Sequence, residues 1–200
     1  MTGLLLYARS RALPTALAAL AGTAAFALWA AGRLDTYVDP DRRVPIVALA
    51  PLLAAAVIGT TLYTASDELD RTAVRPWWPR RLLQLAALTA LAAALLPLAV
   101  LGHPEVFGPA TVIRNVLGCT GLTVAAAVLL GARLSWLPVF GYVTAVYLGS
   151  SGARGRAATV WAWPMQPGAQ PGAWAAALVA FAMGAALYAV RGARAEGPRG

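Results

Sequence analysis

The sequence predicts an all-α membrane protein, a bundle of six transmembrane helices in a single domain that covers residues 1–200. Three observations predict this class. Hydrophobic residues make up 60% of the chain and charged residues 12%, and the mean hydropathy is +0.66, far above that of a soluble domain of this size. The apolar residues fall in long stretches, and most charges fall between them. Each stretch is near the length at which a helix crosses a bilayer while satisfying its own backbone hydrogen bonds.

The first element is a short N-terminal helix that lies along the membrane surface. Residues 3–11, GLLLYARSR, combine an apolar run with the basic residues Arg9 and Arg11. The apolar stretch 13–31 follows and predicts the first span. A cleaved signal peptide is the alternative, because a basic segment precedes an apolar one. We favour an uncleaved helix, since 19 residues is the length of a span rather than of a signal core.

Five further spans are expected at residues 46–63, 82–101, 111–131, 134–150 and 174–190. The connection before the last span is the longest, and its middle is neither plainly polar nor long enough to cross. We expect a short helical segment there on the outer face, with the indoles of Trp161 and Trp163 as interfacial anchors. A substrate gate is the alternative function of this segment.

Arginine placement predicts the orientation. All 16 basic residues are arginine. With the N-terminus inside, ten lie on the cytoplasmic side: Arg9, Arg11, Arg71, Arg75, Arg80, Arg81, Arg133, Arg191, Arg194 and Arg199. Six lie outside: Arg33, Arg42, Arg43, Arg114, Arg154 and Arg156. Because short cytoplasmic loops carry an excess of basic residues, we expect a multi-pass protein of the cell membrane with both termini in the cytoplasm.

The densest group of charges is the segment Ser66–Arg81, SDELDRTAVRPWWPRR, between the second and third spans. It mixes acidic and basic residues, and Trp77 and Trp78 stand between two prolines, where they would anchor the segment at the inner interface. Such a segment is a handle on which a soluble partner could push. An ordinary arginine-rich loop with interfacial tryptophans is the plainer alternative.

Polar residues inside the spans are few. Asn115, Cys119 and Thr123 recur every four residues, and Gly141 and Gly149 lie on one face of the following span. Helix packing, inside the bundle or across a dimer, is the first explanation, and a translocation pathway is the second. Arg114 either extends to water at the outer end of its helix or faces an internal cavity beside Asn115.

Several classes are disfavoured by what the chain lacks. A pI of about 10.8 is typical of nucleic-acid-binding proteins. However, the chain has no basic block on a soluble domain, so we expect no nucleic-acid partner. Without lysine there is no GxxxxGK[ST] phosphate loop, so any ATP hydrolysis requires another chain. The single Cys119 has no partners for a disulfide or a zinc site.

Two sequence patterns are of kinds found in membrane enzymes. Asp67 and Asp70 form one DxxD motif, but a diphosphate-binding site needs a second acidic motif. Residues 149–152, GSSG, resemble the GxSG of intramembrane serine proteases, with His103 as the one available base. Glycine and serine at a helix exit are turn formers first. We therefore expect no catalytic residue and no metal site in this chain.

The arrangement resembles the ABC-2 type transporter permeases. The shared features are six spans, a basic amphipathic N-terminal stretch, a charged segment between spans two and three, and a semi-apolar outer connection before the last span. Locally, Glu68, Arg71, Thr72, Pro79 and Arg80 stand where those permeases carry comparable residues. The chain departs from their pattern in the alanine that follows Thr72, in the missing glycine before it and in the tryptophan pair.

The resemblance implies the permease subunit of an ABC exporter for an apolar or amphipathic substrate such as a lipid, peptide or drug. The chain would not be an enzyme by itself, because ATP and magnesium would bind a separate ATPase subunit. A second permease copy or a sister permease and membrane lipid are the other implied partners. The implied ATPase-coupling residues are Glu68, Asp70, Arg71, Arg75, Arg80 and Arg81. A membrane assembly, anchor or immunity protein is the alternative, since it would show the same hydropathy.

Overall fold

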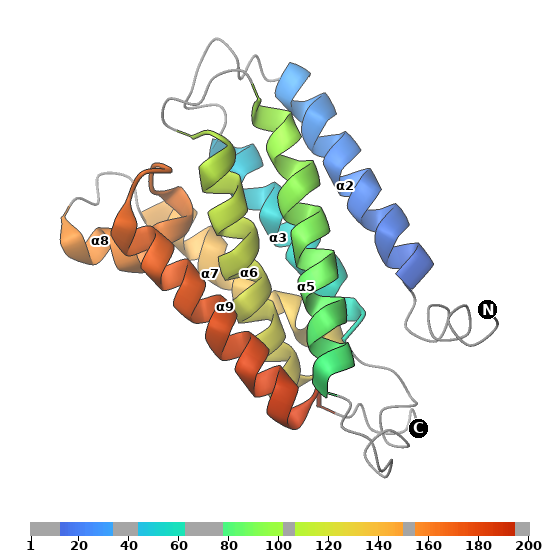
Figure 1. Cartoon of the computed structure of the whole chain (residues 1–200). Helices are drawn as coiled ribbons and strands as arrows, with labels where there is room; N and C mark the ends of the chain where they lie inside the picture. The colour runs from blue at the N-terminus through green and yellow to red at the C-terminus, as the bar shows by residue number, and fades with distance from the viewer. Residues whose placement is uncertain (1–12, 34–43, 63–77, 102–106, 150–154, 195–200) are drawn as a thin grey trace, which may run out of the picture.

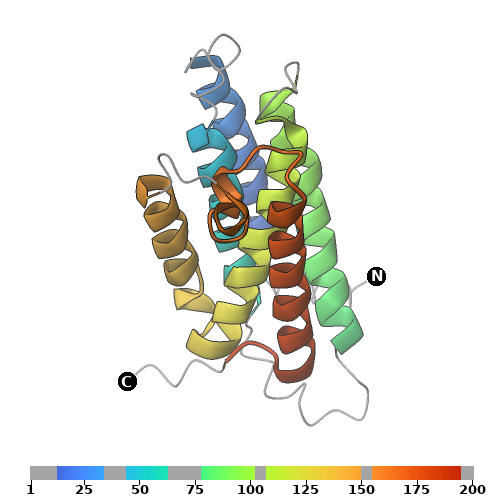
Figure 2. The same cartoon turned by 90° about the vertical axis from the view of Figure 1, so that its left-hand side faces the viewer.

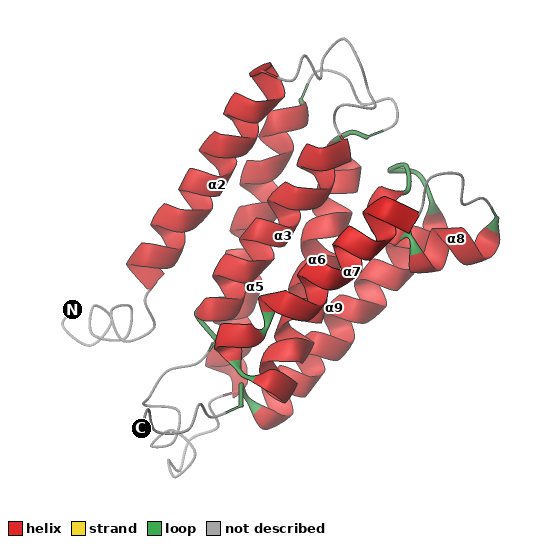
Figure 3. Cartoon of the chain, turned by 180° about the vertical axis from the view of Figure 1, so that it is seen from behind, coloured by secondary structure: helices red, strands yellow, loops and turns green. Residues whose placement is uncertain are grey.

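All regular structure in the described part of the chain is helical. The computed structural model describes residues 13–33, 44–62, 78–101, 107–149 and 155–194. Seven α-helices fall in these ranges: α2 (Leu13–Arg33), α3 (Val44–Thr60), α5 (Trp78–Leu95), α6 (Pro109–Leu130), α7 (Trp136–Gly149), α8 (Arg156–Trp161) and α9 (Pro171–Arg191). Three 3₁₀ turns, η2 (Leu96–Val100), η3 (Ala132–Leu134) and η4 (Trp163–Met165), complete them. The α-helices other than α8 run along the length of one bundle (Figures 1 and 3). The all-helical prediction is thereby confirmed for the described residues.

Four helices are long and apolar enough to cross a membrane. They are α2, α5 with its continuation η2, α6 and α9, of 21, 23, 22 and 21 residues. The other two bundle helices are shorter, with 17 residues in α3 and 14 in α7. Each of the six predicted spans overlaps one of these helices, but only four of the helices in the described residues are long enough to be spans, so the number of six is not confirmed. The third begins at Trp78 rather than at residue 82 and ends in a 3₁₀ turn, because Pro97 has no N–H to continue the α-helix.

Helix α6 is the centre of the bundle. In the most apolar 18-residue window of α6, 72% of the residues are buried, whereas in the corresponding windows of α2 and α9 only 22% are buried. In Figures 1 and 2, α6 lies between α9 on one side and α3 and α5 on the other. In a helix enclosed in this way a buried polar side chain is costly unless a neighbouring element supplies its hydrogen-bond partner, and the hydroxyls of Thr111, Thr120 and Thr123 have none among the described residues.

The contact between α6 and α9 is backbone on backbone. A Cβ atom at Gly121 would collide with the main chain of Ala180 and Phe181, and one at Gly184 would collide with the main chain of Gly121. Small residues allow this approach, which gives close van der Waals packing without any hydrophobic driving force from water. Helices α6 and α9 therefore form one tightly joined pair.

Helices α2 and α7 are the peripheral elements. α2 meets the bundle through one face, formed mostly by alanines: Ala16, Leu20, Ala24, Ala27 and Ala31. α7 buries Val139, Val143 and Val146 and exposes the aromatic side chains of Trp136, Phe140 and Tyr147. Both helices thus present most of their apolar surface to the surroundings of this chain.

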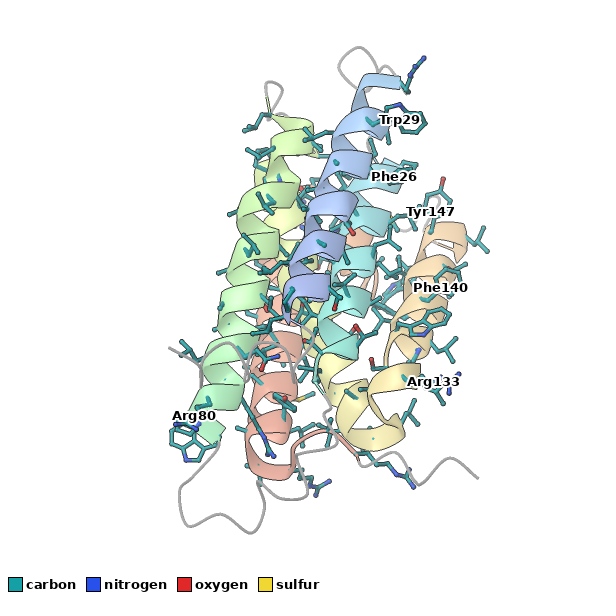
Figure 4. All side chains as sticks on the ribbon, turned by 90° about the vertical axis from the view of Figure 1, so that its right-hand side faces the viewer. Phe26, Trp29, Arg80, Arg133, Phe140 and Tyr147 are labelled. Atoms are coloured by element: carbon teal, nitrogen blue, oxygen red, sulfur yellow. The ribbon has the colours of Figure 1, made fainter. Side chains whose placement is uncertain are left out.

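The first described residue of α2 and the last residue of α9 lie at the same end of the bundle (Figure 1). Five arginines gather there: Arg80, Arg81, Arg133, Arg191 and Arg194; Figure 4 labels two of them. We call this the basic end and the opposite one the far end. None of the chain's acidic residues falls within the described ranges.

Candidate functional site

The far end holds a buried cation. Arg114 lies in the second turn of α6, and its side chain is 0% exposed. Its Nη1 donates to the carbonyl of Pro167 at 2.8 Å and its Nη2 to that of Gln166 at 2.7 Å. The guanidinium is therefore solvated by backbone carbonyls of a segment more than 50 residues further along the chain, with no carboxylate among the described residues to pair with it. Of the two alternatives for Arg114, the internal position is the one observed.

Asn115 completes this network. Its Oδ1 accepts from Arg114 Nε and Nη2, both at 3.3 Å, and its Nδ2 donates to the carbonyls of Val47 at 3.0 Å and Pro164 at 2.8 Å. All of the amide's hydrogen-bonding capacity is used. A satisfied network of this kind holds its members in one geometry, so α3, α6 and the segment before α9 are joined at this amide.

The acceptor on α3 has a cause in the sequence. Pro51 lies inside α3 and has no N–H, so the carbonyl of Val47, four residues earlier, loses its helical partner. In an apolar medium an orphaned carbonyl is costly, and the Asn115 amide satisfies it. Asn115 was expected to be a packing or pathway residue. In the structure its amide donates the hydrogen bond that the Val47 carbonyl lacks within α3.

Next to this network, Trp163 is enclosed by the bundle. Its side chain is 4% exposed, and it packs in an apolar cluster with residues of α3, α6, α7 and α9: Ala48, Leu52, Ala55, Cys119, Val139, Val143, Ala173 and Ala177. Its six-membered ring lies directly against Gly118, where a Cβ atom would collide with it. This differs from the interfacial anchor expected from the sequence, because small residues on four helices leave room for an indole. Trp161, 43% exposed, has the exposure of an anchor.

Tyr142 connects α7 to the same region. Its hydroxyl donates to the carbonyl of Trp161 at 2.5 Å, and its ring centroid lies 6.2 Å from that of Trp163. Figure 2 shows α8 and the turn after it between α7 and α9. The segment 161–170 therefore contacts α3, α6, α7 and α9 at once.

At the basic end, the C-terminal part of α9 joins the ends of other helices. The Tyr188 hydroxyl donates to the carbonyl of Leu62, just after α3, at 3.0 Å. Gly192 has a φ of 70°, and a Cβ atom there would approach Arg81 Nη1 on α5 to 2.8 Å. The backbone conformation favours glycine at this position.

The chain beyond Gly192 then caps α6. Arg194 donates its backbone N–H to the carbonyl of Ala127 at 3.0 Å and its Nη1 to that of Leu129 at 3.0 Å. A cation at a helix C-terminus is favoured by the helix dipole. The last turns of α9 and α6 are thereby held together.

Most of the predicted ATPase-coupling residues lie outside the described residues: Glu68, Asp70, Arg71 and Arg75, together with the predicted anchor Trp77. Trp78 and Arg80 are exposed at the start of α5, whereas Arg81 is buried against the end of α9. The proposed N-terminal interfacial helix, His103 and the serines of the GSSG pattern also lie outside the described residues.

The remaining predicted positions separate into two groups. Thr123 packs where α3 and α6 approach closely, since a Cβ atom at Gly59 would lie 2.6 Å from its methyl carbon. Gly141 and Gly149 are exposed on α7, and a Cβ atom at either would meet nothing within 4 Å. The small residues of α7 therefore do not pack inside the bundle, and packing against another molecule stays a prediction.

Sequence reasoning missed three features of the site: the Gly121–Gly184 contact, the role of Pro51 and the bond from Tyr188 to Leu62. For the role of Pro51, the signal available in the sequence was a proline inside an apolar span. The described residues contain no group of metal-binding side chains. A scan against protein-family models, a search of curated proteins and a search of solved structures each found no match.

Proposed function

We propose that this chain is the transmembrane permease subunit of an ABC-type exporter, powered by a separate ATPase subunit. The helix order supports this proposal. In the chain the charged segment falls between α3 and α5, and the short helical elements α8 and η4 precede the last helix of the bundle. Both features agree with the arrangement expected from the resemblance to ABC-2 permeases.

The observation that carries the proposal is mechanical. Leu62, shortly before the charged segment, accepts a hydrogen bond from Tyr188 of α9, and Arg81, its last residue, lies against Gly192 directly after α9. Helix α9 in turn packs on α6 backbone to backbone through Gly184 and Gly121. A push from a soluble partner on the charged segment would therefore reach the centre of the bundle through rigid elements.

The surface of the bundle supports an apolar or amphipathic substrate. An open groove of about 490 Å³ runs between α2, α3 and the base of α7 near the basic end. Alanine, leucine, valine and Trp136 line it, with hydroxyls from Thr15, Thr60 and Thr61 and no charged side chain. An apolar chain fits such a surface, and a small ion does not.

The same face supports a second permease copy as partner. Phe26 and Trp29 of α2 and Phe140 and Tyr147 of α7 are exposed along it (Figure 4). We expect Gly141→Leu to reduce the dimer fraction in native mass spectrometry without lowering the melting temperature, because the new side chain meets nothing in its own chain. An unchanged dimer fraction would place the copy–copy contact elsewhere.

The experiment that tests the function is affinity purification of the detergent-solubilised chain from its native membrane, followed by mass spectrometry. We expect a P-loop ATPase in stoichiometric amount. With that complex, reversing Glu68 and Arg71 together should abolish stimulation of ATP hydrolysis while membrane insertion is retained. The matched control reverses Asp41 and Arg42, an acidic–basic pair in the loop on the other side of the membrane.

Two outcomes would contradict the proposal. Recovery of a complex without an ATPase would favour an assembly, anchor or immunity protein. Unchanged stimulation in the Glu68 and Arg71 double variant would remove the coupling role from the charged segment.

A further inference from the structure

We propose that residues 162–170 form a plug that closes the far end of the bundle, holds α7 against the other helices and moves out together with α7. The side chain of Trp163 fills the interior. The hydrogen bonds of Arg114 and Asn115 to the backbone of this segment hold it in place, and we call them the latch. The proposal goes beyond the transport function and stands on contacts within the described residues. Its use as the outer gate of a transport cycle would rest on the proposed function.

Trp163 contributes to the contact of α7 with the other helices, beside the direct packing of α7 on α3 and α6. Two of the three buried residues of α7, Val139 and Val143, lie in the cluster around Trp163. Tyr142, between them on α7, donates its hydroxyl to the carbonyl of Trp161 and places its ring beside the indole. Without Trp163, the small side chains around it would leave an unfilled space, because alanine and valine cannot reach across the width of an indole.

The latch acts on the backbone of the plug. Arg114 bonds the carbonyls of Gln166 and Pro167, and Asn115 bonds that of Pro164. Each bond requires the segment to keep its path over the end of α6, whatever side chains it carries. A guanidinium reaches several acceptors in a fixed planar geometry, which an ammonium group cannot reproduce.

The latch is placed where it can open. Gln166 and Pro167 are partly exposed at the rim of the bundle, so polar groups from outside can replace their carbonyls at Arg114. The buried residues around Trp163 beneath them are mostly alanine and valine. Loss of the two Arg114 bonds would free the rim segment while α3, α6 and α9 stay packed, which is a local opening rather than unfolding of the bundle.

The chain contains its own reporter for this opening. Cys119 is the single cysteine, it is 1% exposed, and it belongs to the cluster that surrounds Trp163. With the plug in place its thiol is shielded, and with the plug displaced it meets reagents from the far end. The rate at which a thiol reagent modifies Cys119 therefore measures the population of the open state.

The test uses the purified full-length chain in lipid nanodiscs, with N-ethylmaleimide as probe and no ATPase present. We expect Trp163→Ala and Arg114→Lys each to raise the modification rate of Cys119 by about ten- to a hundredfold, the effect of losing buried contacts of this kind. Trp161→Ala, a change of the same residue type at an exposed position, and Arg33→Gln, which removes an exposed charge at the same end, should leave the rate within about twofold.

A second measurement follows α7 itself. Spin labels at Leu148 on α7 and Val179 on α9, two exposed positions, report their separation in a chain with Cys119→Ala. We expect one distance in the otherwise unchanged chain and a broadened, longer distribution with Trp163→Ala. Tyr142→Phe, which keeps the ring and the fold, should broaden it to a smaller degree.

Two results would overturn the proposal. One is a folded Trp163→Ala protein in which Cys119 stays as protected as before. The other is a reactive Cys119 with an unchanged label distance, which would mean a local cavity and a fixed α7. Because neither measurement involves ATP or a partner, failure of the latch and failure of the permease function are distinguishable.

Discussion

Asn115 on α6 donates its side-chain amide to the carbonyl of Val47 on α3, 3.0 Å away, and this carbonyl is the one that Pro51 leaves without its helical partner. A defect in one helix is thus satisfied by a polar side chain of its neighbour. In water such a carbonyl would bond to solvent, but within an apolar bundle the partner must come from the protein. The pair therefore determines where α3 lies along α6.

A double-mutant cycle tests this relationship. Asn115→Ala should lower the free energy of unfolding by about 2–3 kcal/mol, because it leaves buried carbonyls without donors. Pro51→Ala restores the helical N–H to the Val47 carbonyl, so in the Asn115→Ala background it should recover about 1 kcal/mol. The measurement is reversible unfolding in detergent micelles. Pro138→Ala, in the first turn of α7 where no helical N–H is needed, is the control; equal recovery with both prolines would refute the assignment.

The close contact between α6 and α9 predicts a position-specific effect of one methyl group. Gly121→Ala should lower the free energy of unfolding by about 1–3 kcal/mol, because the added carbon meets backbone atoms of Ala180 that cannot rotate away. Gly141→Ala introduces the same methyl into open space and should leave stability unchanged or raise it slightly. Thermal unfolding of the two variants side by side gives the answer. Similar melting temperatures would mean that α9 shifts without cost.

The bond from α9 to the end of α3 predicts a milder loss. Tyr188→Phe removes the hydroxyl that donates to the Leu62 carbonyl and keeps the ring, so it should cost about 1 kcal/mol of stability. If the chain is coupled to an ATPase, the same variant should also weaken the stimulation of ATP hydrolysis. Tyr147→Phe, at an exposed position of α7, is the matched control. Identical behaviour of the two variants would remove Tyr188 from the coupling path.

The orientation inferred from arginine placement predicts a labelling pattern in intact cells. In a chain with Cys119→Ala, cysteines at Ser66 and Ala195 should resist an impermeant maleimide, and one at Ala157 should react. Ala157 is exposed at the start of α8 and suits the probe better than its neighbour Gly155, whose φ of 102° would strain a cysteine. The reverse pattern would place the basic end outside.

Local features of the sequence predicted the helices well. The six apolar stretches each overlap one helix of the bundle and match its ends within about four residues, except that α5 ends at Leu95 and η2 continues it to Val100. The expected outer-face segment is helical in α8 and η4, although its two tryptophans behave differently. Four predicted coupling residues of the charged segment lie outside the described residues: Glu68, Asp70, Arg71 and Arg75. Their coupling role stays a prediction.

The sequence by itself determined that the chain forms apolar helices, lacks a GxxxxGK[ST] phosphate loop and carries ten of its 16 arginines on one predicted side. These properties are local: a helix satisfies its own backbone, and hydropathy depends on neighbouring residues alone. Only the tertiary structure decided that Arg114 lies inside, that Trp163 fills a space among four helices and that Gly141 faces outward. Those outcomes depend on which residues of distant segments meet. The carbonyls that solvate Arg114 lie 52 and 53 residues away along the chain, a separation over which no local pattern carries information.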